Sequence, residues 1–438
     1  MPDNPAPAPG FAAALAVWLR IGVTSVGGPA AQIGLLHETL VVRRRWISES
    51  DFDTALNFCM LLPGPEAQQL ATYLGWRLHG IRGAIAGGGL FVLPGALLMA
   101  GLSWLSASHA GTAWLKGALT GTLPVVAVLV TLAVVRMARR NLGSPLSLGL
   151  AGLALLGLVA LHLPFVLILA IAAIVGLLNG AWTRRHGPSL PERSRTPDAP
   201  CADTAGGALR WPSLLRRTAG LTVAFGLLWA APVVFAVACL GRAPYLDVAT
   251  VFTEAAFVTF GGAYAVIPFV ASLAVDQHHW ITQADMVHGL ALAETLPGPL
   301  ILTNQYVGYL AGWNAAASGH AGGLGPAAAA AVTAALASWM TFLPCFYFVL
   351  CGAPVMEGLR RDGHIRAAMT GVTSAVVGVI AALGLTVAQA AFWPEGRIDP
   401  AALLVAVGAG LALGPARVPT LVAVLAAAAL GAVRAGYP

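Results

Sequence analysis

Long apolar runs without a single charged residue dominate this 438-residue chain and restrict its fold more than any other feature. Within a bilayer every backbone polar group must be satisfied by the protein, so only helices and closed barrels cross it. Hydrophobic residues make up 58% of the chain and charged residues only 10%, where soluble domains carry about 25% charged residues. The sequence therefore predicts an all-α, multi-pass membrane protein, and it excludes a water-soluble enzyme.

The charge pattern favours a bilayer partner over a nucleic acid. The net charge is +6, and Lys116 is the only lysine among 24 basic residues. In a membrane protein, arginines mark cytoplasmic loops. The five cysteines form no CxxC pair, and no spaced set of histidines accompanies them, so we predict no metal and no cofactor.

An arginine- and proline-rich stretch, residues 183–217, divides the chain into two apolar halves. Its composition predicts a solvent-exposed cytoplasmic linker. The first half, residues 1–182, and the second half, residues 218–438, are predicted to be two transporter-like repeats. The apolar segment 219–240 has no counterpart in the first half and is predicted to be an extra helix.

The two halves repeat each other in sequence. Gly27-Gly28 matches Gly261-Gly262 at an offset of 234 residues, and Leu62-Pro63-Gly64-Pro65 matches Leu296-Pro297-Gly298-Pro299 at the same offset. After one insertion in a Gly/Ala-rich loop the offset becomes 250, where Leu93-Pro94 matches Leu343-Pro344. Internal duplication of this kind recurs in secondary transporters.

The arginine counts predict that the repeats are inserted upside down relative to each other. The first half carries Arg43–Arg45 in one loop, whereas the corresponding loop of the second half, residues 276–280, has no Lys or Arg. The loop 313–326 also has none. The loop holding Lys116 alone corresponds to an arginine-rich loop, residues 358–366. By the positive-inside rule, arginine-rich loops lie in the cytoplasm. A loop that is rich in arginine in one repeat and its arginine-poor counterpart in the other repeat therefore lie on opposite sides of the membrane.

Each repeat carries a Pro-Gly-Pro break inside an apolar segment, 47–76 in the first and 281–312 in the second. Each arm has about 12 residues and reaches about 18 Å, whereas a span needs about 20 residues. We therefore predict broken, re-entrant hairpins that enter from opposite faces. The sequence leaves open whether the Gly-Gly segments span or re-enter.

The breaks are predicted to hold an anion. Pro65 and Pro299 fit the first position of a half-helix, whose free N–H groups carry the positive end of a helix dipole. The polar side chains that follow are predicted to donate hydrogen bonds to it: Gln68, Gln69, Thr303 and Asn304. The alternative is a pair of proline kinks without a ligand.

The Gly-Gly pairs are further candidates for this site. Gly27, Gly28, Gly261 and Gly262 permit positive φ or a close backbone approach, and hydroxyl groups of Ser25 and Thr259 precede them. The alternative is tight helix packing through small residues.

Four charged residues within apolar stretches are predicted to serve coupling: Arg20, Glu66, Glu254 and Glu294. Intramembrane charges are rare and often functional. An ionised Glu66 would oppose anion binding and a protonated one would not, which links anion movement to protons. The alternative is an Arg20–Glu254 ion pair at matched positions.

Several of these segments together resemble the chromate ion transporter family in its long, two-domain form. They are Val23–Gln32, Arg43–Trp46, Phe58–Pro65 with Gln68 and Gln69, Phe260–Pro268, and Glu294–Pro299. The resemblance implies a multi-pass protein of the inner (cytoplasmic) membrane that exports chromate, or the isosteric sulfate, and confers chromate resistance. Val26 and Ala263 depart from the pattern, and these departures leave the substrate open. The sequence also leaves open the coupling ion and whether the protein forms a homodimer.

A second function class remains beside the exporter. A membrane sensor or scaffold would bind an anion without moving it, and it would not need inverted repeats. A membrane reductase lacks a haem, flavin or metal ligand set, so the protein is predicted not to be an enzyme.

Overall fold

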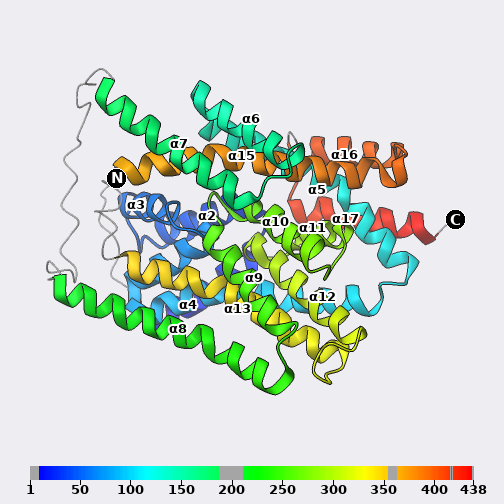
Figure 1. Cartoon of the computed structure of the whole chain (residues 1–438), viewed down its shortest axis with the longest axis horizontal. Helices are drawn as coiled ribbons and strands as arrows, with labels where there is room; N and C mark the ends of the chain where they lie inside the picture. The colour runs from blue at the N-terminus through cyan, green and yellow to red at the C-terminus, as the bar shows by residue number, and fades with distance from the viewer. Residues whose placement is uncertain (1–8, 187–210, 354–362, 415, 417, 437–438) are drawn as a thin grey trace.

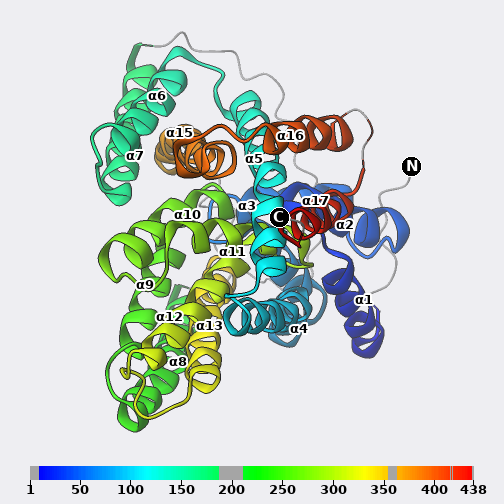
Figure 2. The ribbon, with the colours of Figure 1, turned by 90° about the vertical axis from the view of Figure 1, so that its right-hand side faces the viewer.

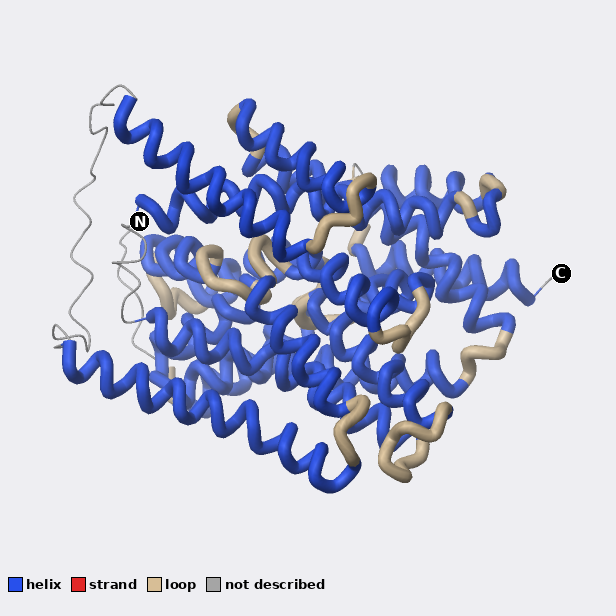
Figure 3. The backbone as a smooth tube through the Cα atoms, in the orientation of Figure 1, coloured by secondary structure: helices blue, strands red, loops and turns tan. Residues whose placement is uncertain are grey.

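The computed structural model describes residues 9–186, 211–353, 363–414, 416 and 418–436, and their regular structure is entirely helical (Figure 3). Six helical segments in this part are long and apolar enough to cross a membrane: Glu66–Ser108, Ala113–Asn141, Phe165–Thr183, Arg216–Leu240, Pro326–Gly352 and Gly363–Phe392. The predicted all-α, multi-pass membrane architecture is thereby confirmed.

The first half builds seven α-helices and one π-helix. They are α1 (Phe11–Thr24), α2 (Gly28–His37), the π-helix η1 (Glu38–Arg43), α3 (Glu49–Cys59), α4 (Glu66–Ser108), α5 (Ala113–Asn141), α6 (Pro145–Val159) and α7 (Phe165–His186).

The second half opens with α8 (Trp211–Leu240) and then follows the same order of elements. These are α9 (Tyr245–Val258), α10 (Ala263–Ala271), the π-helix η2 (Ser272–Gln277), α11 (Gln283–Thr295), the 3₁₀ turn η3 (Leu300–Leu302), α12 (Thr303–Ala317), α13 (Pro326–Gly352), α15 (Gly363–Phe392), the 3₁₀ turn η5 (Pro394–Gly396), α16 (Pro400–Leu413) and α17 (Thr420–Gly436). The two π-helices begin 234 residues apart, so the sequence offset is also an offset of backbone geometry.

Helix α4 is a helical hairpin whose two arms meet at His79 and Gly80, which have non-helical backbone angles. A Cβ on Gly75 would overlap the Gly83 carbonyl, and a Cβ on Gly87 would lie 2.5 Å from the Ala71 carbonyl oxygen. In each of these pairs the two residues lie at equal distances in sequence before and after the turn, which is the pattern of antiparallel arms. Helices α12 and α13 form the equivalent pair, joined by a longer loop, and small residues allow this close approach in both.

The carboxyl-terminal helices of the two halves are exchanged. Helix α5 packs against α16 and α17, while α15 packs against α6 and α7. The contacts depend on glycine, because a Cβ on Gly121 would lie 2.5 Å from the Ala427 carbonyl oxygen and one on Gly371 would overlap the Ala172 carbonyl. Figure 2 shows α15 and α16 above α3, α10 and α11, with α4, α8, α12 and α13 below.

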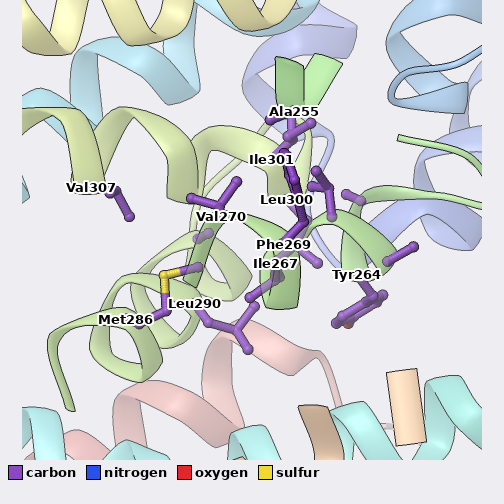
Figure 4. Close-up of a cluster of buried hydrophobic side chains, with 14 of the residues drawn as sticks. Ala255, Tyr264, Ile267, Phe269, Val270, Met286, Leu290, Leu300, Ile301 and Val307 are labelled. Carbon is purple, nitrogen blue, oxygen red and sulfur yellow. The ribbon is translucent and has the colours of Figure 1, made fainter. Parts of the chain in front are cut away.

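The largest apolar cluster includes α9, α10, α11 and η3 of the second half and extends to residues of α4, α5, α6 and α7 in the first half. Leu300 and Ile301, directly after the second Pro-Gly-Pro, lie among side chains of this cluster (Figure 4). Burial of these two side chains anchors the break to the core, so the backbone there is held by packing as well as by hydrogen bonds.

The predicted linker 183–217 lies mostly outside the described residues. Its two ends are helical, since α7 continues to His186 and α8 begins at Trp211. Figure 1 shows the end of α7, the start of α8 and the end of α13 on the left, and the loop between α12 and α13 at the lower right.

Candidate functional site

Each Pro-Gly-Pro break is bonded to the Gly-Gly loop of the other half. The Gly64 N–H donates to the Thr259 carbonyl at 2.7 Å, and the Gly298 N–H donates to the Ser25 carbonyl at 2.9 Å. Gly64 matches Gly298 and Ser25 matches Thr259 at the 234-residue offset, so the same interaction is made twice. The two segments that the sequence singled out in each half therefore meet across the halves.

Glycine is required at the centre of both breaks. Gly64 has φ 130° and Gly298 has φ 95°, angles at which other residues are strained. A Cβ on Gly64 would lie 2.8 Å from Cys345 Sγ on α13. On the other side, the Pro297 carbonyl occupies the space that a Cβ on Gly95 of α4 would need. Gly95 and Cys345 match at the 250-residue offset, so each break packs on an equivalent helix.

The Gly-Gly loops also break helices. Gly27, Gly28, Gly261 and Gly262 have φ between 78° and 103°, and they separate α1 from α2 and α9 from α10. The Ser25 hydroxyl accepts a second bond from the Gly298 N–H at 3.0 Å, and the buried Thr259 hydroxyl donates to the Ala255 carbonyl. Positive φ, and not only close packing, explains these four glycines.

Helix starts follow both breaks, with no side chain capping them. Pro65 lies at the N-cap of α4 and not at the first helical position that the sequence suggested. The first helical bond runs from the Gln69 N–H to the Pro65 carbonyl, which leaves the N–H groups of Glu66, Ala67 and Gln68 before it. After Pro299 a 3₁₀ turn intervenes, and α12 starts at Thr303.

The polar side chains predicted to face an anion are all buried, and each donates a hydrogen bond within the protein. The Gln69 amide donates to the Pro63 carbonyl at 2.6 Å, the Gln68 amide to Thr72 Oγ1, and the Asn304 amide to Thr341 Oγ1. The Thr303 hydroxyl donates to the Leu300 carbonyl. The side-chain atoms left without a partner are the amide oxygens of Gln68, Gln69 and Asn304. Each NH₂ group has two N–H donors, so one is used in these bonds and the second is available to a ligand.

Sequence reasoning missed Gln32, which joins the two segments at the second break. Its amide donates to the Gly298 carbonyl at 2.6 Å and to the Ser25 carbonyl at 3.3 Å, and the side chain is 2% exposed. The matched residue in the second half is Val266. Gln32 is therefore not repeated in the second half, and matching the two halves could not identify it.

One carboxyl group lies at each break. Glu294, three residues before Pro297, is 3% exposed and accepts a hydrogen bond from the Tyr264 hydroxyl of α10. Glu66 directly follows Pro65, and its Oε1 lies 3.9 Å from the place of a Cβ on Gly262. Neither carboxyl is repeated in the other half.

Arg20 and Glu254 are not brought together. Both side chains are exposed, and their helices α1 and α9 lie on opposite sides of the molecule (Figure 2). Neither residue forms an ion pair with any described residue. The described part of the chain also has no group of three or more residues suited to hold a metal ion.

Comparison with known proteins decides the family. The profile of the chromate transporter family matches residues 12–177 and 246–432, which together make up most of the chain. The protein belongs to the chromate transporter family. The profile covers both Gly-Gly loops and both Pro-Gly-Pro breaks, and it leaves out α8.

Several curated proteins are similar over most of their length. A chromate transport protein of Pseudomonas aeruginosa is 33% identical over 85% of this chain and 80% of its own length. A chromate transport protein of Cupriavidus metallidurans is 28% identical over 96% of this chain and 92% of its own. No solved structure matches the chain.

Proposed function

We propose that this protein is a secondary transporter that exports chromate, or the isosteric sulfate, across the cytoplasmic membrane and so confers chromate resistance. The observation that carries the proposal is the reciprocal pairing of the two breaks, Gly64 with Thr259 and Gly298 with Ser25. Discontinuous helices from two repeats, crossing at the middle of the protein, are the arrangement in which transporters hold their substrates.

Inverted repeats would let this site open to either side in turn. The arginine counts favour inversion, and α3 lies in the left half of Figure 1 whereas α11 and α12 lie in the right half. With one hairpin entering from each face, movement of one repeat against the other would expose the breaks alternately. A sensor that only binds an anion would not need this symmetry.

The uncapped helix starts after Pro65 and Pro299 supply the proposed affinity for an oxyanion. Free N–H groups and the positive end of the helix dipole favour negative charge. Gln68, Gln69, Thr303 and Asn304 lie in the first turns that follow. Rotation of a side-chain amide exchanges its oxygen for its NH₂ group, so each of the three amides provides donors once an anion is present.

The membrane potential alone is sufficient to drive export. One elementary charge crossing 100 mV changes the free energy by about 2.3 kcal/mol. A chromate dianion leaving a negative interior therefore gains roughly 4–5 kcal/mol, which corresponds to a concentration ratio of over a thousandfold. A proton gradient would act on the return of the empty carrier.

The test is flux in proteoliposomes made with the purified full-length protein. Chromate and sulfate movement is measured under an imposed potential, an imposed pH gradient, both, and neither. Export predicts substrate movement toward the positive compartment that is absent from protein-free vesicles. Binding of chromate without any flux under all four conditions would favour the sensor or scaffold.

A further inference from the structure

A cavity of about 330 Å³ lies between the start of α6 and the end of α7, over the first turns of α15. Helices α6 and α7 meet at their joined ends, where a Cβ on Gly157 would lie 3.4 Å from Ile168 Cδ1. The cavity lies at the opposite ends of these two helices. Its volume falls within the range of about 300–1,000 Å³ that is usual for small-molecule sites. None of its described lining residues belongs to a helix break, so it is separate from the candidate anion site.

Polar side chains line this cavity from all three helices. They include Arg366, Thr370 and Ser374 of α15, Asn179 and Thr183 of α7, and Ser147 of α6. The three residues of α15 follow one another at a spacing of four, which places them on one face of the helix. The described lining residues include no Asp or Glu, so Arg366 makes the cavity positively charged.

The donors and acceptors in the cavity suit a phosphate with an alcohol beside it. The hydroxyl groups of Thr370, Ser374 and Thr183 each donate to a carbonyl of their own helix, and their oxygens can still accept a hydrogen bond. The side-chain amide of Asn179 makes no hydrogen bond with any described residue and has two N–H donors. A guanidinium group has five N–H donors, so Arg366 can serve more than one partner, and it pairs well with phosphate oxygens.

The surface around the cavity faces lipid. Leu178 and Trp182 of α7 and Leu148 of α6 are exposed, and Figure 2 shows α6 and α7 at the edge of the molecule, with α15 on their inner side. Tryptophan is typical of the membrane interface. The arginine counts predict that the loop 358–366 before α15 is cytoplasmic. The cavity is then at the level of the phosphate groups of the cytoplasmic leaflet, where anionic lipids attract basic residues.

We propose that this cavity binds the headgroup of an anionic phospholipid of the cytoplasmic leaflet, with the phosphate at Arg366 and Asn179 and headgroup hydroxyls at Thr370 and Thr183. Phosphatidylglycerol has both of these parts, and its acyl chains would lie along the exposed apolar side chains of α6 and α7. Phosphatidylcholine carries a quaternary ammonium group and no headgroup hydroxyl, so the cavity should select against it. Inorganic phosphate would gain nothing from the apolar surface.

The opposite face of α15 supports the Gly-Gly loop of the second half. A Cβ on Gly261 would lie 2.8 Å from Val376 Cγ1. Val376 is two residues from Ser374, and two residues turn a helix by about 200°, so one side chain points to the loop and the other to the cavity. A lipid in the cavity therefore holds α15 against this loop and should stabilise the folded protein. Lipid binding here is independent of whether the protein transports an anion.

The experiment measures lipid binding to the purified full-length protein in detergent, by native mass spectrometry and by lipid-dependent thermal stabilisation. The added compounds are phosphatidylglycerol, phosphatidylcholine and inorganic phosphate. The wild type should bind phosphatidylglycerol more tightly than phosphatidylcholine. Arg366→Gln should weaken the binding of phosphatidylglycerol about ten- to a hundredfold, which corresponds to one charge-assisted contact. Arg366→Lys keeps the charge and should retain part of the affinity.

Two further variants separate the cavity from the general charge of the cytoplasmic face. Thr370→Leu leaves Arg366 in place but fills space in the cavity, so it should also weaken phosphatidylglycerol binding. Arg139, at the end of α5, is exposed like Arg366 but does not line the cavity. Arg139→Gln is therefore the matched control and should bind phosphatidylglycerol as the wild type does.

Three results would overturn the inference. The first is equal affinity of the wild type for the two lipids. The second is wild-type affinity in both Arg366→Gln and Thr370→Leu, or an equal loss in Arg139→Gln. The third is stabilisation by inorganic phosphate as large as that by phosphatidylglycerol, which would identify a site for a free anion and reject the lipid.

Discussion

Gly64 and Gly298 combine a positive φ with direct packing against α13 and α4. A leucine at either position would meet both restrictions at once. We expect Gly64→Leu and Gly298→Leu to abolish chromate flux while the protein still inserts, because the rest of each helix is unchanged. Gly89→Leu is the control, since a Cβ there meets nothing within 4 Å. Normal flux in both break variants would mean that the breaks are only kinks.

Glu294 and Glu66 differ in their surroundings, which separates their expected roles. Glu294 is buried and receives the Tyr264 hydroxyl, whereas Glu66 lies at a helix start against Gly262. We expect Glu294→Gln to reduce the pH response of transport more than Glu66→Gln, because Glu294 is the more deeply buried carboxyl and water screens its charge less. The measurement is chromate flux against pH at a fixed potential. If both variants keep the wild-type response, potential-driven uniport is the surviving mechanism.

The sequence located the residues of the site better than it assigned their contacts. It identified both breaks and both Gly-Gly loops because each occurs twice at matched positions. It identified both carboxyl groups because charges within apolar stretches are rare. It could not show that the amides of Gln69 and Asn304 already donate within the protein, since their acceptors lie on neighbouring backbone and on α13. Equal offsets also suggested an Arg20–Glu254 pair, but matched positions in two repeats are related by symmetry and need not be in contact.

At the scale of elements, Asp399 joins α16 to α17. Its carboxylate accepts from the Ala401 N–H at the start of α16 and from Arg434 Nη1 of α17 at 2.7 Å. The hydrogen bond from Arg434 holds the pKa of Asp399 below its usual range. A lowered folded-state pKa stabilises the protein above the ordinary carboxyl pKa, and this contribution is lost as pH falls through the folded value.

We therefore expect Asp399→Asn to lower the melting temperature in detergent at neutral pH by a few degrees at most, since the pair is partly exposed. The difference from wild type should shrink as the pH approaches that of carboxyl protonation. Glu38→Gln, at an exposed ion pair with Arg43, is the comparison. A difference that is constant with pH would show that the side-chain amide merely caps α16 less well.

Helix positions were predictable from the apolar runs, but helix ends and helix partners were not. Hydropathy fixed where α5, α13 and α15 lie, because lipid requires helices there. The end of the predicted segment 47–76 lies close to the turn inside α4 at His79 and Gly80, whereas Pro65 caps α4 instead of occupying its first helical position. The exchange of α5 and α15 between halves depends on which small-residue faces meet, and hydropathy carries no information about partners.

At the scale of the whole molecule, the repeats are predicted to be inverted, with the linker 183–217 and the loop 358–366 in the cytoplasm. Loops 276–280 and 313–326 should lie in the periplasm. A variant retaining only Cys201 should resist a membrane-impermeant thiol reagent in intact cells, whereas Ser318→Cys in a cysteine-free background should react. Permeabilised cells provide the control, where both should react. The reverse pattern in intact cells would reject the inverted arrangement.

The exchange of carboxyl-terminal helices has a consequence for biosynthesis. Helices α5 and α7 leave the ribosome long before α15 and α17, yet these later helices cover Gly117, Gly121 and Gly176. During translation the first half must wait in the bilayer with these close-packing surfaces facing lipid. A premature stop codon before Thr420 would remove α17, so the loss of this late helix would destabilise a helix made some 300 residues earlier and expose the nascent protein to proteolytic quality control.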